Sequence, residues 1–402
     1  MTGSWLAALC LALTAINLIS LAIGLWRIGR ARRGGRDAAA PVSIVRPLCG
    51  LERFSEETLA SGFRLAHPCY ELIFCVARAG DPIVPLVRRL MAAHPAIPAR
   101  LILGEERVSE NPKLNNCVRG WEAARHEWVI LADSNVLMPA DYVQRLVAAW
   151  RPETGLVCST PVGAAPLGFW AEVECAFLNT LQARWQYVGE SLGLGFAQGK
   201  SMLWHKPFLE AHGGIRALGA EIAEDAAATK LVRAAGRRVH LVGAPFPQPL
   251  GRRRAAEVWA RQLRWARLRR VTFPLFFAPE VGIGALVPMA CAAPAAGGGL
   301  AGLLAVLGTG ALWYGGEWIL AARNGWHRSW RWPAVCLARD AMQLGVWLAA
   351  WVARDVVWRG NAMVVRAKPA GASAPVPPRP ERGIDTTGPA RHSGGVPAWR
   401  NW

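Results

Sequence analysis

The sequence lacks the cysteine spacing of a zinc site or a disulfide framework. Its nine cysteines are scattered without one C-x-x-C pair, and several lie in apolar runs. Buried structural cysteine in a reducing compartment is the simplest interpretation. The sequence also has no internal repeat, zinc-finger spacing, RNP-like motif or basic heptad region. Nucleic acid is therefore the weakest candidate partner.

Acidic residues are in short supply as well. The chain carries 46 Lys and Arg residues against 28 Asp and Glu residues, a formal net charge of +18. This balance suits an anionic membrane surface or a phosphorylated substrate. Hydrophobic residues make up 52% of the 402 residues, and the basic clusters lie beside apolar segments. We therefore expect a membrane protein.

The first apolar segment covers residues 5–26, and its length fits one bilayer span. A basic run follows it directly, at Arg27, Arg30, Arg32, Arg33 and Arg36. A cleaved signal peptide needs its positive charge before the apolar run, so the order here favours an uncleaved anchor. The positive-inside rule then places the next domain in the cytoplasm, and the predicted location is the cell inner membrane.

The middle of the chain alternates between strand-like and helix-like segments. The expected strands are 42–45, 71–77, 100–103, 128–132 and 156–159, and the expected helices are 55–66, 81–94, 116–125 and 141–150. This alternation predicts an α/β fold with parallel strands and crossover helices. The aromatic, helical stretch at 168–190 fits an interfacial helix, an acceptor-binding wall or plain core packing.

Three apolar blocks follow, at 273–291, 292–322 and 334–352, and they predict two or three spanning or re-entrant helices. The residues from about 367 onward are rich in Pro, Gly, Ala, Ser and Arg, a composition that is typical of disorder. The predicted domains are an N-terminal transmembrane anchor with a basic linker (1–40), an α/β domain (41–270), C-terminal membrane helices (271–366) and a disordered tail (367–402).

Two acidic segments are candidates for chemistry. Asp133-Ser134-Asn135 directly follows the apolar run at 128–132, where a carboxylate is well placed to hold a divalent cation and a diphosphate. The alternative is an ordinary turn at a strand end. Glu224-Asp225 opens a helix, so it offers a general base, or simply complements the helix dipole.

Two basic segments complete the set. Arg261 and Arg264 are three residues apart in Arg261-Gln262-Leu263-Arg264-Trp265 and suit a leaving diphosphate. A basic amphipathic helix on a membrane surface is the alternative. Lys113, in Asn111-Pro112-Lys113-Leu114-Asn115-Asn116, is placed to contact a phosphate or a base, or lies in a loop before a helix that Asn caps.

Together these segments resemble the inverting family 2-type glycosyltransferases of GT-A fold, and most specifically the bacterial-type ceramide glucosyltransferases. The resemblance rests on five stretches between residues 42 and 265: V-S-I-V-R-P-L-C-G at 42–50, N-P-K-L-N-N at 111–116, D-S-N at 133–135, A-E-D at 223–225 and R-Q-L-R-W at 261–265. It implies a Rossmann-like mixed sheet flanked by an N-terminal transmembrane anchor and C-terminal membrane helices.

The resemblance also implies a role for each residue. Asp133 and Asn135 would bind Mg²⁺ or Mn²⁺. The nucleotide would be bound by Lys113, Asp81, Asp133 and Glu224. The catalytic residues would be Asp225 as the base and Arg261, Arg264 and Trp265, which close over the diphosphate and acceptor.

The sequence departs from the family pattern at two places. Asp81 is the one aspartate in the run at 77–82, where members usually carry another, and Gln182-Ala183-Arg184 replaces the His-Pro-Arg of animal members. The implied activity is transfer of a hexose, glucose above all, from a UDP-sugar to ceramide. A hopanoid or diacylglycerol glycosyltransferase is the alternative enzyme, and an inactive lipid-binding scaffold is the alternative outside enzymes. A processive polysaccharide synthase is disfavoured by the small number of spans.

Overall fold

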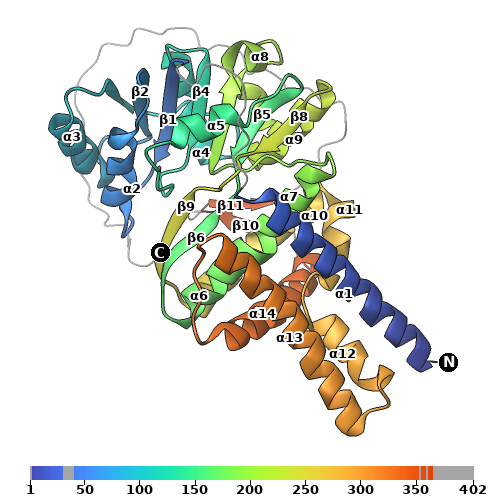
Figure 1. The fold of residues 1–402 in the computed structure, drawn as a ribbon. Coiled ribbons are helices and arrows are strands. Elements are labelled where there is room, and N and C mark those ends of the chain that lie inside the picture. Colours follow the sequence, from blue (N-terminus) through green and yellow to red (C-terminus); the bar gives the residue numbers. More distant parts are fainter. Residues whose placement is uncertain (1, 30–39, 353–354, 359–360, 365–402) are drawn as a thin grey trace. The chain divides into compact units, whose positions relative to one another are not determined.

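The computed structural model describes residues 2–29, 40–352, 355–358 and 361–364, which fall within one compact unit (Figure 1). Most of the basic run after Arg27 and the whole predicted tail at 367–402 lie outside the described residues. The predicted boundaries at 40/41 and 270/271 stay predictions.

A mixed sheet forms the centre of the upper part of Figure 1. Within the described residues it has seven strands in the order β3-β2-β1-β4-β7-β5-β8. These strands are β1 (Val42–Leu48), β2 (Tyr70–Val76), β3 (Ala99–Leu103), β4 (Trp128–Ala132), β5 (Thr154–Ser159), β7 (Ser201–His205) and β8 (Arg238–Leu241). Two smaller sheets pair β6 (Val162–Leu167) with β9 (Pro247–Arg252), and β10 (Asp355–Trp358) with β11 (Asn361–Val364).

The pairing of strands in the main sheet shows which strand predictions are correct and which strand was missed. β1 to β4 pair in parallel, as expected from strands alternating with crossover helices. β7 was not predicted, and it runs antiparallel to both β4 and β5. This one reversed strand makes the sheet mixed, which confirms the mixed α/β fold that the resemblance implied.

Helices cover both faces of the sheet because its strands are apolar on both sides. Ile44 of β1 belongs to one buried cluster and Val45 to the other, as the alternation of a strand requires. The first face is covered by α2 (Ser55–Ser61), η1 (Gly62–Arg64), α3 (Ile83–Ala93) and α5 (Tyr142–Ala148). The second is covered by α4 (Pro112–Ala123), α8 (Lys206–Glu210), η3 (Ile215–Ala220) and α9 (Glu224–Ala234).

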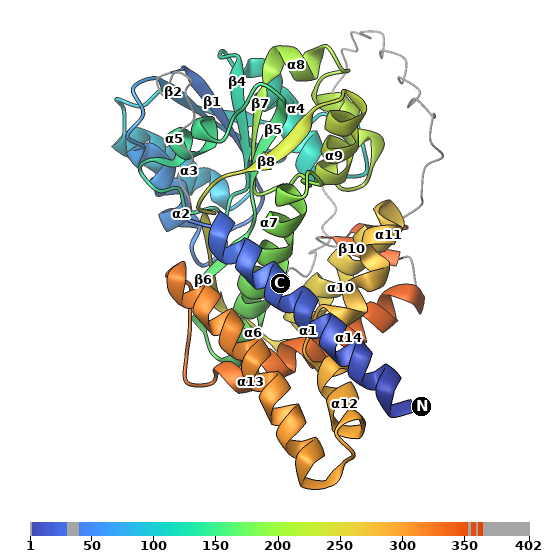
Figure 2. The same ribbon diagram turned by 45° about the vertical axis from the view of Figure 1, so that its right-hand side comes forward.

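A helical column leads away from the sheet and is visible in Figure 2. It consists of α6 (Phe169–Ala176), a π-helical turn η2 (Phe177–Ala183) and α7 (Arg184–Ser191). This is the aromatic stretch expected at 168–190. Phe177 and Tyr187 within it are fully buried, so core packing accounts for these two aromatic side chains.

Further helical segments lie near this column. They are α1 (Thr2–Arg27), α10 (Ala255–Thr272), α11 (Pro274–Phe277), η4 (Ala278–Gly282), α12 (Leu286–Ala295), α13 (Gly299–Arg323) and α14 (Trp332–Val352). All of them except the arginine-rich α10 are largely apolar. Among the described residues, three helices are long and apolar enough to cross a membrane: Ser4–Arg27, α13 and α14. A fourth candidate is the pair Pro274–Gly282 and Leu286–Ala295, bent by 46°. These findings fit the expected N-terminal anchor and the two or three C-terminal segments.

A buried ion network joins the column to the apolar helices. Arg184 of α7 donates to Asn17 of α1 at 2.6 Å and lies 3.5 Å from Glu317 of α13. Glu317 also pairs with Arg339 of α14 at 2.7 Å, and Arg339 pairs with Asp340 at 2.7 Å. The side chains of the four charged residues are at most 1% exposed. Since unpaired charge in an apolar interior is costly, this network fixes the helices relative to the column.

Candidate active site

The Asp133-Ser134-Asn135 turn lies at the carboxyl end of β4, between the parallel strand β1 and the antiparallel strand β7. Arg46 of β1 is fully buried and holds this turn from beneath. Its Nη2 donates to the carbonyl oxygen of Ser134 at 3.0 Å and to that of Asp133 at 3.2 Å. Burial lowers the pKa of Arg46 to about 10, still far above neutrality, so the guanidinium stays charged.

Lys113 brings three separate motifs together. Its Nζ lies 2.6 Å from Asp133 Oδ1 and 2.6 Å from Glu224 Oε1, and it donates to the carbonyl oxygen of Gly199 at 2.6 Å. Lys113 occupies this place because α4 begins at Pro112, earlier than the predicted helix at 116–125. The segment around Lys113 is therefore helical, and Asn111 caps that helix.

Asn111 serves the site in a second way. Its Oδ1 accepts from the backbone N–H groups of Lys113 and Leu114, while its Nδ2 donates to Glu224 Oε2 at 2.7 Å. The cap thus fixes the start of α4 and one oxygen of Glu224 together. The other oxygen of Glu224 pairs with Lys113, so this carboxylate is fully engaged.

Gly199 explains how closely these groups approach. A Cβ at this position would lie 2.7 Å from Glu224 Oε1 and 3.0 Å from Lys113 Nζ. A larger residue would displace the end of the Glu224 or Lys113 side chain, so glycine at this position permits the close ion pair. The backbone N–H of Gly199 also donates to Asp225 Oδ2 at 3.3 Å.

Lys200 is a site residue that the sequence reasoning missed. Its Nζ lies 2.9 Å from Asp133 Oδ2 and donates to Asn135 Oδ1 at 3.1 Å. A basic residue after a glycine is too common to be a signal. The strand β7 that positions it also escaped prediction.

The oxygen donors at this turn suit a hard divalent cation. Asp133 and Asn135 present a carboxylate and an amide oxygen to one ammonium group, so they face a common position. No group of three or more His, Cys, Asp or Glu residues in the described part of the chain is arranged to hold a metal. A cation at this turn would therefore draw further ligands from a diphosphate and water, as Mg²⁺ commonly does.

The charges in the cluster shift the ionisation of its carboxylates in opposite directions. Burial alone would raise the pKa of Asp133, but the ammonium groups of Lys113 and Lys200 outweigh it and hold that pKa well below its ordinary value. Burial and the neighbouring charge of Glu224 raise the pKa of Asp225 to about 7. Asp133 therefore stays ionised, while the carboxyl group of Asp225 titrates near neutral pH.

The remaining predicted residues have partners elsewhere. Asp81 accepts from the backbone N–H groups of Gly50 and Ile83 at the ends of β1 and α3. On α10, Arg261 pairs with the fully buried Glu174 of α6, and Arg264 is partly buried. Trp265, also on α10, packs against a small apolar cluster formed by Cys175, Leu178 and Leu250.

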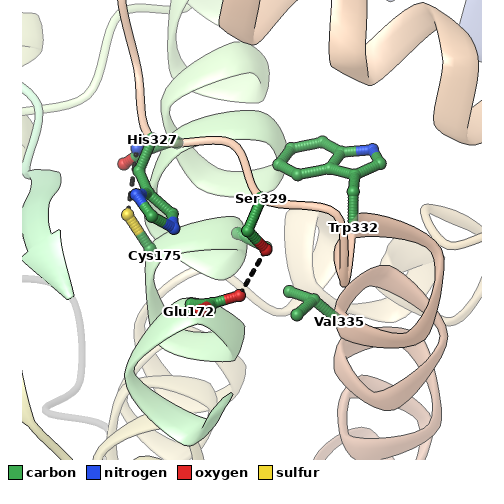
Figure 3. Close-up of a pocket in the computed structure, with 8 residues that line it drawn as sticks. Glu172, Cys175, His327, Ser329, Trp332 and Val335 are labelled. Carbon is green, nitrogen blue, oxygen red and sulfur yellow. Dashed lines mark hydrogen bonds between the residues drawn. The ribbon is translucent and has the colours of Figure 1, made fainter. Parts of the chain in front are cut away.

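A hollow lies between α6 and the segment leading into α14 (Figure 3). Ser329 donates to Glu172 Oε2 at 2.6 Å on one side, while Trp332 forms an apolar wall. The Nε2 atom of His327 is buried there and has no hydrogen-bond partner within the described residues. This hollow is separate from the lysine–carboxylate cluster, and it borders the helix that carries Glu174.

Comparison with known proteins places these features in a family. The family model described as Glycosyl transferase family 21 matches residues 10–370. Ceramide glucosyltransferase 1 of Caenorhabditis elegans is 28% identical over 269 residues, which cover 66% of this chain and 58% of that protein. Ceramide glucosyltransferase of Komagataella phaffii is 31% identical over 112 residues, 27% of this chain and 22% of that protein. The matched part is thus less than two thirds of each relative.

A solved structure supports the fold. The mannosyltransferase PcManGT from Pyrobaculum calidifontis, in complex with GDP-Man and Mn²⁺, aligns with a TM-score of 0.50 and 20% identity. The alignment covers 86% of this chain and 98% of that one. At this identity the likeness shows a shared glycosyltransferase fold and nothing about the substrate.

Proposed function

The chain belongs to glycosyl transferase family 21, and we propose that it transfers a hexose, glucose above all, from a UDP-sugar to the hydroxyl group of ceramide. The observation that carries this proposal is the contact of Lys113 with both Asp133 and Glu224. This contact brings the turn that we propose to face the diphosphate next to the carboxylate pair that we propose to contain the base. The apolar helices α1, α13 and α14 would hold the chain in the membrane, where a lipid acceptor resides.

Asp225 is the proposed base. Its carboxylate takes the proton of the acceptor hydroxyl while that oxygen attacks the anomeric carbon. In the same step the bond between this carbon and the diphosphate oxygen breaks, and UDP leaves with the bonding electrons. Attack from the face opposite the leaving group inverts the configuration, and one carboxylate suffices for such a single displacement. A pKa of about 7 suits Asp225 for this role.

The leaving diphosphate needs positive charge. Asp133 and Asn135 would hold Mg²⁺ or Mn²⁺, which neutralises the diphosphate when bound. Lys113 adds a fixed ammonium group beside them. Arg261, Arg264 and Trp265 on α10 are proposed to close over the diphosphate and acceptor, and Asp81 to lie on the nucleotide side. The catalytic domain is proposed to face the cytoplasm of the inner membrane.

The proposal is tested by measuring UDP release from the purified full chain. Each UDP-hexose would be presented with ceramide, a hopanoid or diacylglycerol in mixed micelles, and lipid extracts of expressing cells would be examined for new glycolipids. We expect UDP release and a hexosylceramide with UDP-glucose. A new glycolipid built on a hopanoid or diacylglycerol would change the acceptor, while release with none of the lipids would favour an inactive scaffold.

A further inference from the structure

Lys200 places an ammonium group where a divalent cation would bind. Its Nζ is 2.9 Å from Asp133 Oδ2 and 3.1 Å from Asn135 Oδ1, the two residues proposed as metal ligands. An ammonium group is a compact cation that takes oxygen partners, as Mg²⁺ and Mn²⁺ do. The lysine and the metal therefore compete for the same oxygens.

The two lysines at Asp133 differ in how firmly they are held. Lys113 Nζ has three oxygen partners, two of them carboxylates, and its side chain is 16% exposed. Lys200 Nζ pairs with one carboxylate and one neutral amide, and its side chain is 19% exposed. Lys200 is the lysine that a divalent cation displaces more easily.

The backbone keeps the displaced lysine within reach. The carbonyl oxygen of Lys200 accepts from the N–H of Asp133 at 3.0 Å, and the next residue, Ser201, pairs with Ala132 in the sheet. The flexible four-carbon stem can turn while this anchor stays fixed. Repulsion between the divalent cation and the ammonium group would drive this rotation of the side chain, and the diphosphate oxygens offer the ammonium group a new partner.

We propose that Lys200 occupies the metal position in the nucleotide-free protein and turns to the diphosphate oxygens when the divalent cation arrives with the nucleotide. The inference rests on the proposed function, because its ligand is a nucleoside diphosphate. It assigns Lys200 two opposite effects. Lys200 weakens binding of the metal alone, and it strengthens binding of UDP once the metal is present.

The experiment compares the full chain with its Lys200→Met variant. Mn²⁺ alone is titrated first, with free Mn²⁺ followed by electron paramagnetic resonance. UDP is then titrated at saturating Mn²⁺ by calorimetry. Removing one competing charge should raise the affinity for Mn²⁺ alone about tenfold, and losing one charge-assisted contact should lower the affinity for UDP about tenfold. Lys200→Arg should keep the weak Mn²⁺ binding of wild type.

Lys230→Met is the matched control, because Lys230 is an exposed lysine on α9 that pairs with Glu221. Both affinities should match wild type in this variant. If Lys200→Met binds Mn²⁺ alone no more tightly than wild type, Lys200 does not compete with the metal. If its affinity for UDP is unchanged, Lys200 does not contact the diphosphate. Wild type that fails to bind UDP at any Mn²⁺ concentration overturns the proposed function instead. The titration with Mn²⁺ alone still decides whether Lys200 competes for the metal position.

Discussion

Glu224 and Asp225 are adjacent in sequence, yet their carboxylates are used differently. Both oxygens of Glu224 are engaged, one by Lys113 at 2.6 Å and the other by Asn111 at 2.7 Å. Asp225 accepts a longer bond, 3.3 Å, from the backbone N–H of Gly199, and its pKa is raised to about 7. This contrast is the reason for proposing Asp225, rather than Glu224, as the base.

The first prediction tests that assignment by the substitution Asp225→Asn. Asparagine keeps the size of the side chain but cannot take the acceptor's proton, so kcat should fall about 10²–10⁴-fold. UDP-sugar binding should stay near wild type, because the lost interaction belongs to the transition state. Steady-state kinetics and calorimetric titration measure the two quantities. Near-normal turnover in Asp225→Asn with an inactive Glu224→Gln would move the base to Glu224.

The second prediction concerns pH. Because the pKa of Asp225 is raised to about 7, its carboxyl group is protonated below that pH and cannot act as a base. The value of kcat/KM should therefore rise with pH, with a midpoint near the same value. Glu224→Gln removes a like charge that raises this pKa, so the rising limb should shift to lower pH. A profile that is flat across neutrality would rule out Asp225 as the titrating base.

The third prediction concerns the metal. Asp133→Ala removes the one carboxylate of the proposed cation site, and Asn135 supplies no charge to replace it. The affinity for UDP in Mn²⁺ should fall by more than about tenfold. Even mutation of residues that only hydrogen-bond to a metal ligand typically lowers metal affinity by about 10–100-fold. Calorimetry with and without a chelator measures this loss. Asp141→Ala, at an exposed aspartate paired with Arg145, is the control and should bind as wild type does.

The fourth prediction concerns the buried ion network. Glu317 lies between Arg184 and Arg339 with its side chain fully buried. Glu317→Gln leaves the buried Arg184 without its carboxylate partner and Arg339 with Asp340 alone. The free energy of unfolding should therefore fall by about 3–5 kcal/mol. Thermal unfolding in detergent micelles measures the loss. Glu56→Gln breaks an exposed pair with Arg89 and should cost less than about 1 kcal/mol. Equal melting temperatures for the two variants would contradict this account.

The fifth prediction concerns orientation. Cys49 and Cys69 are exposed on the α/β domain. If this domain faces the cytoplasm, a membrane-impermeant maleimide should label the protein only after the inner membrane is opened. The double variant Cys49→Ser, Cys69→Ser should lose most of this labelling, which identifies the reacting thiols. Labelling in intact spheroplasts would reverse the proposed topology.

The sequence predicted the parallel half of the sheet because β1 to β4 are short apolar runs separated by helical segments. It missed β9, whose residues include Pro247 and Pro249. Proline lacks a backbone donor and is typical of edges and loops, so the pattern favoured a loop. Among the described strands β9 pairs only with β6, which leaves it at an edge where proline is tolerated.

The candidate site could be predicted from the sequence where its residues carry charge at the ends of regular elements. Asp133 and Asp225 met this condition. The bridge formed by Lys113 was not predictable, because it depends on α4 and α9 converging on the loop at Gly199. For Arg261 the position in the chain was predicted but the contact was not. Its position on α10 was foreseen, but its buried partner Glu174 lies far away in sequence.

The buried network has a consequence for how this protein can be divided. Arg184 belongs to the column beneath the sheet, while its partners Asn17 and Glu317 lie on α1 and α13. Arg27 of α1 likewise forms a buried pair with Glu190 of α7 at 2.8 Å. A chain cut at residues 40 and 270 would leave Arg184 and Glu190 without these partners. Exchanging catalytic domains between relatives should therefore succeed only when the apolar helices are transferred with them.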